Sequence, residues 1–521
     1  MTDKLNPRGV SLATSLAAAN AHINAVQKYR REAETVHIVG AGGALTAAYE
    51  QLRNAAEYAE EHMLLQRAIA RFFRRTFLLR DAKLVEKSGE ELAVELTLAG
   101  YLPNDAIPEK TITQINELAV LYHDAYRSLE KRRGITPRDL DRWTVRCLAV
   151  EVESLLNDDS LKQVYVQFAY EHFINTLDFA ELLDGEPADK ETALYVAIHR
   201  ALLKSDLPVI RHGLLRRYQQ TPAKLDEFVH TNKEIDKLFE SSTTEKLYRA
   251  VDRQGASLRI LRHMIEQDDK LDEMLANPDR FLASFEAQVK ENYETIDSRI
   301  NKGIIRSVIF LIITKALVGV LIEVPYDYLV HGKIATVPLV VNLLFPPLYM
   351  ILLRMTLLRP EAANTKHLSN NIEHILYGDP NKKQLKRRAS SFGSGYNFVY
   401  GLIFVAVFGS VATWLWLGLG FDILHLLIFF VFLSTASFLG FRLSRQIREI
   451  EAVDSQQNGV TLIRDFLYMP FVVVGRYMSD KYSKINIVAV VLDMLIELPL
   501  KTILRLIRQW SAFISSKKDQ L

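Results

Sequence analysis

The stretch IIRSVIFLIITKALVGVLIEV, residues 304–324, is apolar over a length that few soluble helices reach. A helix of about 20 residues, rising 1.5 Å per residue, crosses the ~30 Å hydrocarbon core of a bilayer. Three more runs of similar length follow, and short connections at Pro325–Lys333 and Gly420–Asp422 join the runs in pairs. The sequence therefore predicts two transmembrane hairpins, made of Ile304–Val324 with Ile334–Leu353 and Tyr396–Leu419 with Ile423–Phe441.

The first 302 residues are polar and show apolar positions three or four apart, which is typical of amphipathic helices. No set of alternating strands is visible, so we expect an all-α, polytopic helical membrane protein with a large N-terminal cytosolic helical domain. The predicted domains are a helical region at 1–302 (with subdomains 1–100, 101–220 and 221–302), a first hairpin at 303–358, a basic loop at 359–394, a second hairpin at 395–441 and cytoplasmic or interfacial amphipathic helices at 442–521. Two further spans within residues 460–510 are the alternative for this last region.

Three Xaa-Pro pairs predict helix starts in the polar region, because Pro is well tolerated in the first helical turn. Thr136-Pro137 is followed by Asp139, which would complete a capping arrangement, and Thr221-Pro222 has the same form. Asn277-Pro278 begins an apolar stripe that continues into the first span, so one helix is expected to run from the cytosol into the membrane. Gly303 is the expected soft point in that helix.

Basic residues predict the orientation, since loops rich in Lys and Arg remain in the cytoplasm. They gather at 354–388, between the second and third spans, and again at 442–448 after the fourth span, whereas the opposite side offers only Lys333. We therefore expect a protein integral to an inner or plasma membrane with both termini cytoplasmic. The short outer loops leave no room for a receptor domain or an outward-facing enzyme.

The charge of the chain is divided between its halves. Residues 303–521 hold 23 Lys and Arg against 14 Asp and Glu, while residues 1–302 hold 41 against 48. An acidic soluble half argues against nucleic acid as a partner, because phosphate binding needs a concentrated basic surface. The lipid bilayer is the expected partner, and a candidate contact with anionic headgroups is formed by Lys382, Lys383, Lys386, Arg387 and Arg388. The single cysteine, Cys147, is expected to be a buried helix residue.

Motifs for catalysis, cofactors or metals are weak. Gly40–Gly43 resembles a phosphate-binding turn but lacks the second strand and the third glycine of a dinucleotide site, so a joint between helices is favoured. His123-Asp124 and the single E-x-x-H at Glu227–His230 lack the further ligands that a metal site needs. We expect no catalytic residue, no cofactor and no metal, and the chain is not expected to be an enzyme.

Charged residues within the apolar segments give the strongest functional indication, because burying an ion in lipid is costly. Lys315 and Glu323 lie in the first span, where Glu323 is expected near the interface beside Pro325. Asp493 and Glu497 lie in the tail at Ile485–Trp510, on one polar stripe. These four residues form the predicted intramembrane polar site.

The leading functional hypothesis is a membrane-anchored scaffold or interaction protein, which presents its cytosolic helices to an unidentified protein partner. The alternative is a small transporter or channel, oligomeric because four spans alone form a narrow pore, in which the intramembrane charges line a polar path. A homo-oligomer is compatible with both hypotheses. A membrane-bound enzyme is the third hypothesis.

Overall fold

A computed structural model describes residues 4–35, 63–79, 81–183, 187, 189–357, 362–379, 394–452, 466–467, 469, 471–477 and 510. This described part is helical, and its only bridge of the β type joins Thr35 and Pro108. The all-α prediction is therefore confirmed. The helices before the long apolar ones are α1 (Pro7–Glu32), α3 (Leu64–Leu79), α4 (Ala82–Glu86), α5 (Ser88–Leu98), α6 (Glu109–Glu130), α7 (Pro137–Leu140), η2 (Asp141–Val145), α8 (Arg146–Leu156), α9 (Ser160–Thr176), α10 (Phe179–Leu182), α11 (Lys190–Ile198), η3 (His199–Leu203), α12 (Leu207–Arg217), α13 (Leu225–Glu240), α14 (Ser242–Gln254), α15 (Ala256–Gln267) and α16 (Leu271–Met274).

The remaining helices are α17 (Pro278–Val318), η4 (Gly319–Glu323), α18 (Val324–His331), α19 (Thr336–Met355), α20 (Ala362–Tyr377), α21 (Ser394–Leu419) and α22 (Ile423–Arg448). The chain divides into two compact units. The hairpin unit comprises Met1–Asn6, Asp252–Gln267 and Met274–Ile485, and the helical unit comprises Pro7–Val251, Asp268–Glu273 and Asn486–Leu521.

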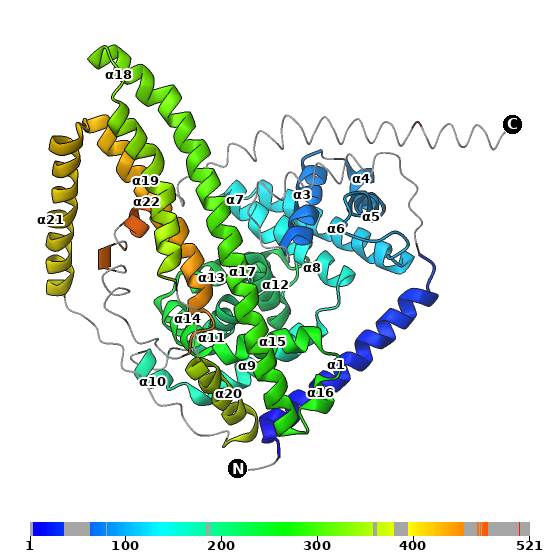
Figure 1. The fold of residues 1–521 in the computed structure, drawn as a ribbon. Coiled ribbons are helices and arrows are strands. Elements are labelled where there is room, and N and C mark those ends of the chain that lie inside the picture. Colours follow the sequence, from blue (N-terminus) through cyan, green and yellow to red (C-terminus); the bar gives the residue numbers. More distant parts are fainter. Residues whose placement is uncertain are drawn as a thin grey trace. The chain divides into compact units, whose positions relative to one another are not determined.

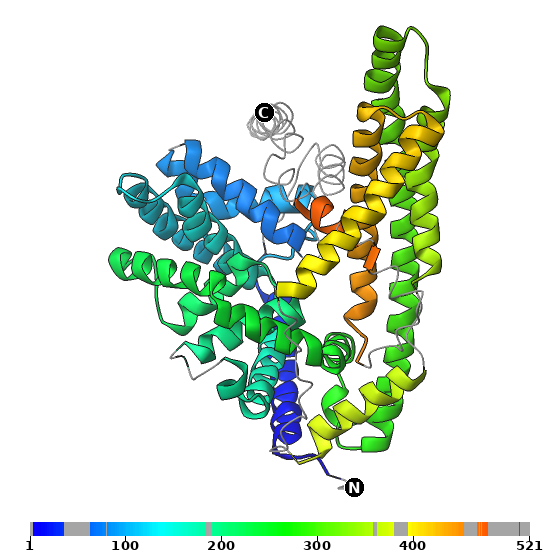
Figure 2. The same cartoon turned by 90° about the vertical axis from the view of Figure 1, so that its left-hand side faces the viewer.

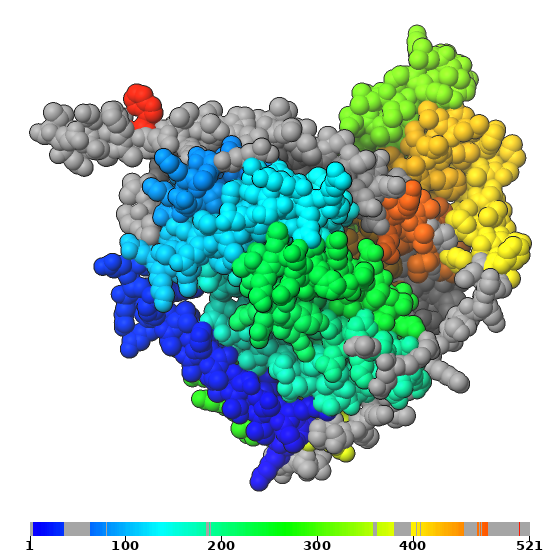
Figure 3. Space-filling view, turned by 180° about the vertical axis from the view of Figure 1, so that it is seen from behind, coloured from blue at the N-terminus to red at the C-terminus, as the bar shows by residue number. Residues whose placement is uncertain are grey.

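The helical unit has an apolar core of its own. Ile112, Ile115, Tyr122 and Leu129 lie along one side of α6 and are buried. Cys147 on α8 is fully buried, and this burial raises the pKa of its thiol to about 12. In the space-filling view α1, in blue, runs as a rod along the surface of this unit (Figure 3).

Two of the three predicted helix starts are confirmed. The Thr136 hydroxyl accepts a hydrogen bond from the Asp139 amide at 3.1 Å, and the Asp139 carboxylate accepts one from the Thr136 amide at 3.3 Å, which completes a capping box. Asn277 caps α17 by accepting from the Arg280 amide at 3.1 Å. The third prediction was wrong, because Thr221–Lys224 forms turns and α13 begins only at Leu225.

The predicted long helix is present in the hairpin unit. Helix α17 runs without a break from Pro278 to Val318 and continues through η4 and α18 to His331. Gly303 lies inside it at a point of close packing, since a Cβ there would lie 2.5 Å from the Leu443 side chain of α22. The missing side chain of Gly303 allows the two helices to approach, and its role as a soft point stays a prediction.

Helices α17, α19 and α22 pack together along their lengths (Figures 1 and 2). An apolar cluster fills the space between them and includes Ile304, Leu311, Met350, Leu353 and Phe432. Arg354 at the end of α19 holds the Asp297 carboxylate of α17 at 2.7 Å. These contacts define a three-helix bundle, which is the framework of the candidate site.

Helix α21 is the least buried of the long apolar helices, because only 6% of its most apolar stretch is buried. It contacts α22 through a second cluster, in which Leu415, Phe421, Phe429, Leu433 and Phe471 are buried. Four helices are long and apolar enough to span a membrane, with ranges Pro278–His331, Thr336–Met355, Phe398–Leu419 and Ile423–Arg448. These correspond to the four predicted runs, but the first connection is only Gly332–Ala335 because α18 continues the helix past Pro325.

Candidate functional site: a buried polar stripe

One face of the long helix carries polar residues at a spacing of four. Lys315, Glu323, Asp327 and His331 are separated by eight, four and four residues, and Gly319 occupies the skipped position. Residues four apart lie on the same side of a helix, and 16 residues rise about 24 Å. The four side chains therefore form a stripe from the middle of the bundle to the end of α18.

The deepest part of the stripe is an ion pair. The Lys315 ammonium donates to the Glu323 carboxylate, and the two side chains are 1% and 0% exposed. Phe432 of α22 lies beside the same ammonium, with its ring centre 5.3 Å from Nζ, so that its π face also faces the cation. Both charges are removed from solvent, and each is compensated mainly by the other.

A π-helical turn at η4 brings this pair together. Eight residues of regular α-helix would rotate Glu323 by about 80° relative to Lys315. The wider turn at Gly319–Glu323 adds residues to one turn and reduces that offset. It also directly precedes Pro325, whose ring would crowd the carbonyl four residues earlier in a regular helix. The π turn thus accommodates the proline and aligns the ion pair.

The second hairpin contributes polar residues at the same end. Asp422 caps α22, accepting from the His425 amide at 3.0 Å and lying 2.8 Å from His425 Nδ1. The other ring nitrogen of His425 lies 3.4 Å from Asp327 Oδ1. Asn342 of α19 donates to the His425 carbonyl at 3.3 Å. His425 therefore stands between two carboxylates, one from each hairpin.

The inner part of the network is buried and only partly hydrogen-bonded. Asp327 and Asn342 are 0% exposed and His425 is 1% exposed. Glu323 Oε2, Asp327 Oδ1, Asn342 Oδ1 and His425 Nε2 form no hydrogen bond within the described part of the chain. Buried polar atoms left in this way cost roughly 1–3 kcal/mol each, so they call for a functional explanation.

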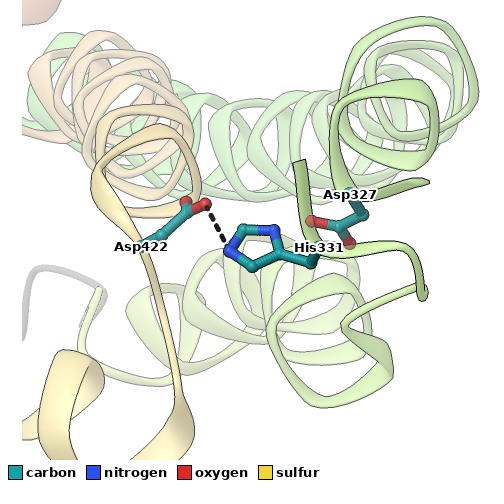
Figure 4. Close-up of side chains that lie close together, drawn as sticks. All are labelled: Asp327, His331 and Asp422. Atoms are coloured by element: carbon teal, nitrogen blue, oxygen red, sulfur yellow. Dashed lines mark ion pairs between the residues drawn. The ribbon is translucent and has the colours of Figure 1, made fainter. Parts of the chain in front are cut away.

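A group able to hold a metal lies at the end of the stripe. Asp327, His331 and Asp422 each offer a ligand atom, and these atoms lie within 4.8 Å of one another. Figure 4 shows the His331 ring between the two carboxylates, and His331 Nε2 is 4.0 Å from Asp422 Oδ2. His331 is 43% and Asp422 is 24% exposed, whereas Asp327 is buried. The stripe therefore reaches the surface at this group.

The opposite end of the stripe is closed. Below Lys315 the bundle contains the apolar cluster of Leu311, Met350, Leu353 and Phe432, without a charged member. The polar chain thus runs from the surface to Lys315 and stops there. Its geometry can hold cations or protons at several depths.

The predicted site residues have different outcomes. Lys315 and Glu323 contact each other, and Glu323 is buried within the bundle, contrary to the expectation that it lies near the interface. Asp493 and Glu497 lie outside the described residues, as do Gly40–Gly43 and the candidate lipid contact Lys382, Lys383, Lys386, Arg387 and Arg388. His123 and Asp124 lie 3.9 Å apart on α6, and neither they nor Glu227 and His230 belong to the metal-capable group.

Sequence reasoning missed Asp327, His331, Asp422 and His425 and expected no metal. It treated residues 325–333 and 420–422 as loops, so Asp327, His331 and Asp422 seemed to be ordinary loop residues, and it placed His425 in the fourth apolar run without assigning it a role. The repeat of polar residues every four positions from Glu323 to His331 was the signal that a helix continued there.

The fold and the site together define an all-α protein with four candidate membrane-spanning helices and a buried polar stripe between three of them. No protein-family model, no curated protein and no solved structure matches the chain.

Proposed function

We propose that the protein is a membrane transport protein that moves a small cation or protons along the buried stripe. The observation that carries this proposal is the fully buried Lys315–Glu323 pair. The next polar side chains along the stripe, Asp327 and His425, are buried as well. An ionised residue in the middle of a span costs roughly 2.5–3.5 kcal/mol to insert. A buried ion pair adds little net stability over apolar residues, so stability alone does not account for these residues.

The arrangement supports transport in a further way. The stripe opens at the end where the two hairpin connections meet, which is the outer side in the predicted orientation. The apolar cluster below Lys315 would close it toward the cytoplasm. Transport then requires α17, α19 and α22 to separate on the cytoplasmic side of Lys315. In the closed bundle, α17 and α22 are in close contact at Gly303 and Leu443.

Exchange in vesicles tests the proposal. The purified chain is reconstituted into liposomes that contain a pH-sensitive dye, and Na⁺, K⁺, Mg²⁺ or Zn²⁺ is added outside. We expect at least one cation to change the internal pH faster than in empty vesicles, and Glu323→Gln to abolish the change. Glu294→Gln, an exposed carboxylate on the same helix, is the control and should leave the rate unchanged. Rates equal to those of empty vesicles with every cation would contradict transport.

A second candidate function is the scaffold. The separate apolar core of the helical unit favours it, because such a unit can present a stable surface to a partner in the cytosol. In a host that lacks the native chain, the scaffold hypothesis predicts that the Lys315→Met/Glu323→Gln double variant restores the phenotype and that deletion of residues 7–251 does not. The transport hypothesis predicts that the double variant also fails to restore it.

A further inference from the structure

We propose that Asp327, His331 and Asp422 bind a divalent first-row transition-metal cation, of which Zn²⁺ is the representative. This inference deepens the proposed function by naming its cation, and it rests on that function only for transport, because binding can be measured without flux. The three ligand atoms lie within 4.8 Å of one another and come from both hairpins (Figure 4). A bound cation would therefore join α18 to the start of α22.

The two carboxylates are already oriented for this role. The Ala335 amide donates to Asp327 Oδ2 at 2.8 Å and leaves Oδ1 without a hydrogen bond within the described chain, although the side chain is fully buried. His425 Nδ1 lies 2.8 Å from Asp422 Oδ1, and the other oxygen, Oδ2, faces His331. Metal sites commonly fix one side of a ligand by an outer hydrogen bond in this way.

The local charge also favours a cation. Two carboxylates meet here, while the ammonium of Lys315 lies at the far end of the stripe and is engaged by Glu323. Among the described residues, the partners of the Asp327 carboxylate are the His425 ring, 3.4 Å away, and the Ala335 amide. A buried carboxylate with so few partners is costly, and a divalent cation would offset the charge of both carboxylates together.

The ligand types select the class of metal. Mg²⁺ and Ca²⁺ prefer shells of oxygen atoms only, whereas an imidazole with carboxylates suits Zn²⁺ and its first-row neighbours. Zn²⁺ bonds to N and O at about 2.0–2.2 Å, which places tetrahedral ligand atoms roughly 3.3 Å apart. His331 Nε2 and Asp422 Oδ2 are 4.0 Å apart, so this pair would have to approach by roughly 0.7 Å. His331 ends α18 and its side chain is 43% exposed, which leaves it free to make that movement.

Direct binding to the full chain in detergent tests the site. After treatment with a chelator, Zn²⁺ alone is titrated by calorimetry, and retained metal is measured after dialysis. We expect one Zn²⁺ per chain, with Mg²⁺ unable to compete. His331→Ala and Asp422→Asn should each weaken binding by roughly tenfold or more. His230→Ala, an exposed histidine on α13, is the matched control and should bind as the wild type does.

Asp327→Asn is a third variant, but its buried position makes misfolding a risk, so His331→Ala at the exposed end carries the test. Zn²⁺ binding that is absent, or equal in the wild type and His331→Ala, would overturn the site.

The vesicle assay separates the two proposals. Zn²⁺ binding without any cation-driven pH change upholds the site and overturns transport, whereas exchange of another cation without Zn²⁺ binding overturns the site and upholds transport.

Discussion

Single residues of the helical unit show how burial sets protonation. Glu153 on α8 is half-buried, and desolvation raises the pKa of its carboxyl to about 7, more than the nearby Lys162 lowers it. The folded chain therefore binds this proton more tightly than the unfolded chain does. Glu153 costs no stability below pH ~4.5, where both states are protonated, and its cost grows to a maximum above pH ~7.

We therefore predict that Glu153→Gln stabilises the protein at pH 8 and has little effect at pH 4.5. The gain should grow by up to roughly 1.4 kcal/mol per pH unit between these values, because one pKa unit corresponds to that free energy. Thermal unfolding of the full chain in detergent at several pH values measures it. Glu240→Gln, at the exposed end of α13, is the control and should show the same small effect at each pH. A Glu153→Gln effect that does not change with pH would contradict the assignment.

The residues of the candidate site were predictable only in part. Lys315 and Glu323 stood out because ions are rare in apolar runs. Their pairing depended on the π turn at Gly319–Glu323, which no pattern of residue types indicated. Asp422 and His425 join the stripe through packing between hairpins, and a single sequence does not reveal such contacts.

At the scale of the elements, two glycines set the distance between helices of the bundle. A Cβ at Gly440 of α22 would collide with the Leu353 side chain of α19. Gly440→Val should overpack the interface between α22 and α19 and lower the free energy of unfolding by about 1–3 kcal/mol. Unfolding in detergent measures this loss, and adding Leu353→Ala should recover part of it.

Gly409→Val on α21 is the matched control, since nothing lies within 4 Å of a Cβ at that position. It should have little effect on stability. Equal losses at Gly440 and Gly409 would show that helix propensity, and not the packing of α22 on α19, determines the outcome.

The helices themselves followed closely from the sequence. Caps at Thr136 and Asn277 mark real starts because their side chains satisfy free amides. The helix start predicted at Thr221-Pro222 was wrong because the same dipeptide also suits a turn. Pro325 was taken as the end of a span, but a proline early in a new helical segment is compatible with continuation when a π turn precedes it.

At the scale of the whole molecule, the two hairpins pack so that their connections lie close together. Asp327 and His331 of the first hairpin meet Asp422 and His425 of the second, so both connections lie at one end of the bundle. In the orientation that the basic residues of the sequence predict, this end would lie outside.

We predict that reporters fused at residues 1, 375 and 521 read as cytoplasmic and that one in the 332–335 connection reads as external. Reporter activity in intact cells measures each position. An external reading at residue 375 would contradict the orientation, and the stripe would then open toward the cytoplasm.

The central claim is that Lys315 and Glu323 meet as charges inside the bundle, and a double-mutant cycle tests it most directly. Lys315→Met, Glu323→Gln and the double variant are unfolded in detergent beside the wild type. We predict that each single change costs about 3–5 kcal/mol, because it leaves the other charge buried and unpaired, and that the double variant recovers most of the loss. Small single effects that simply add in the double variant would contradict the claim.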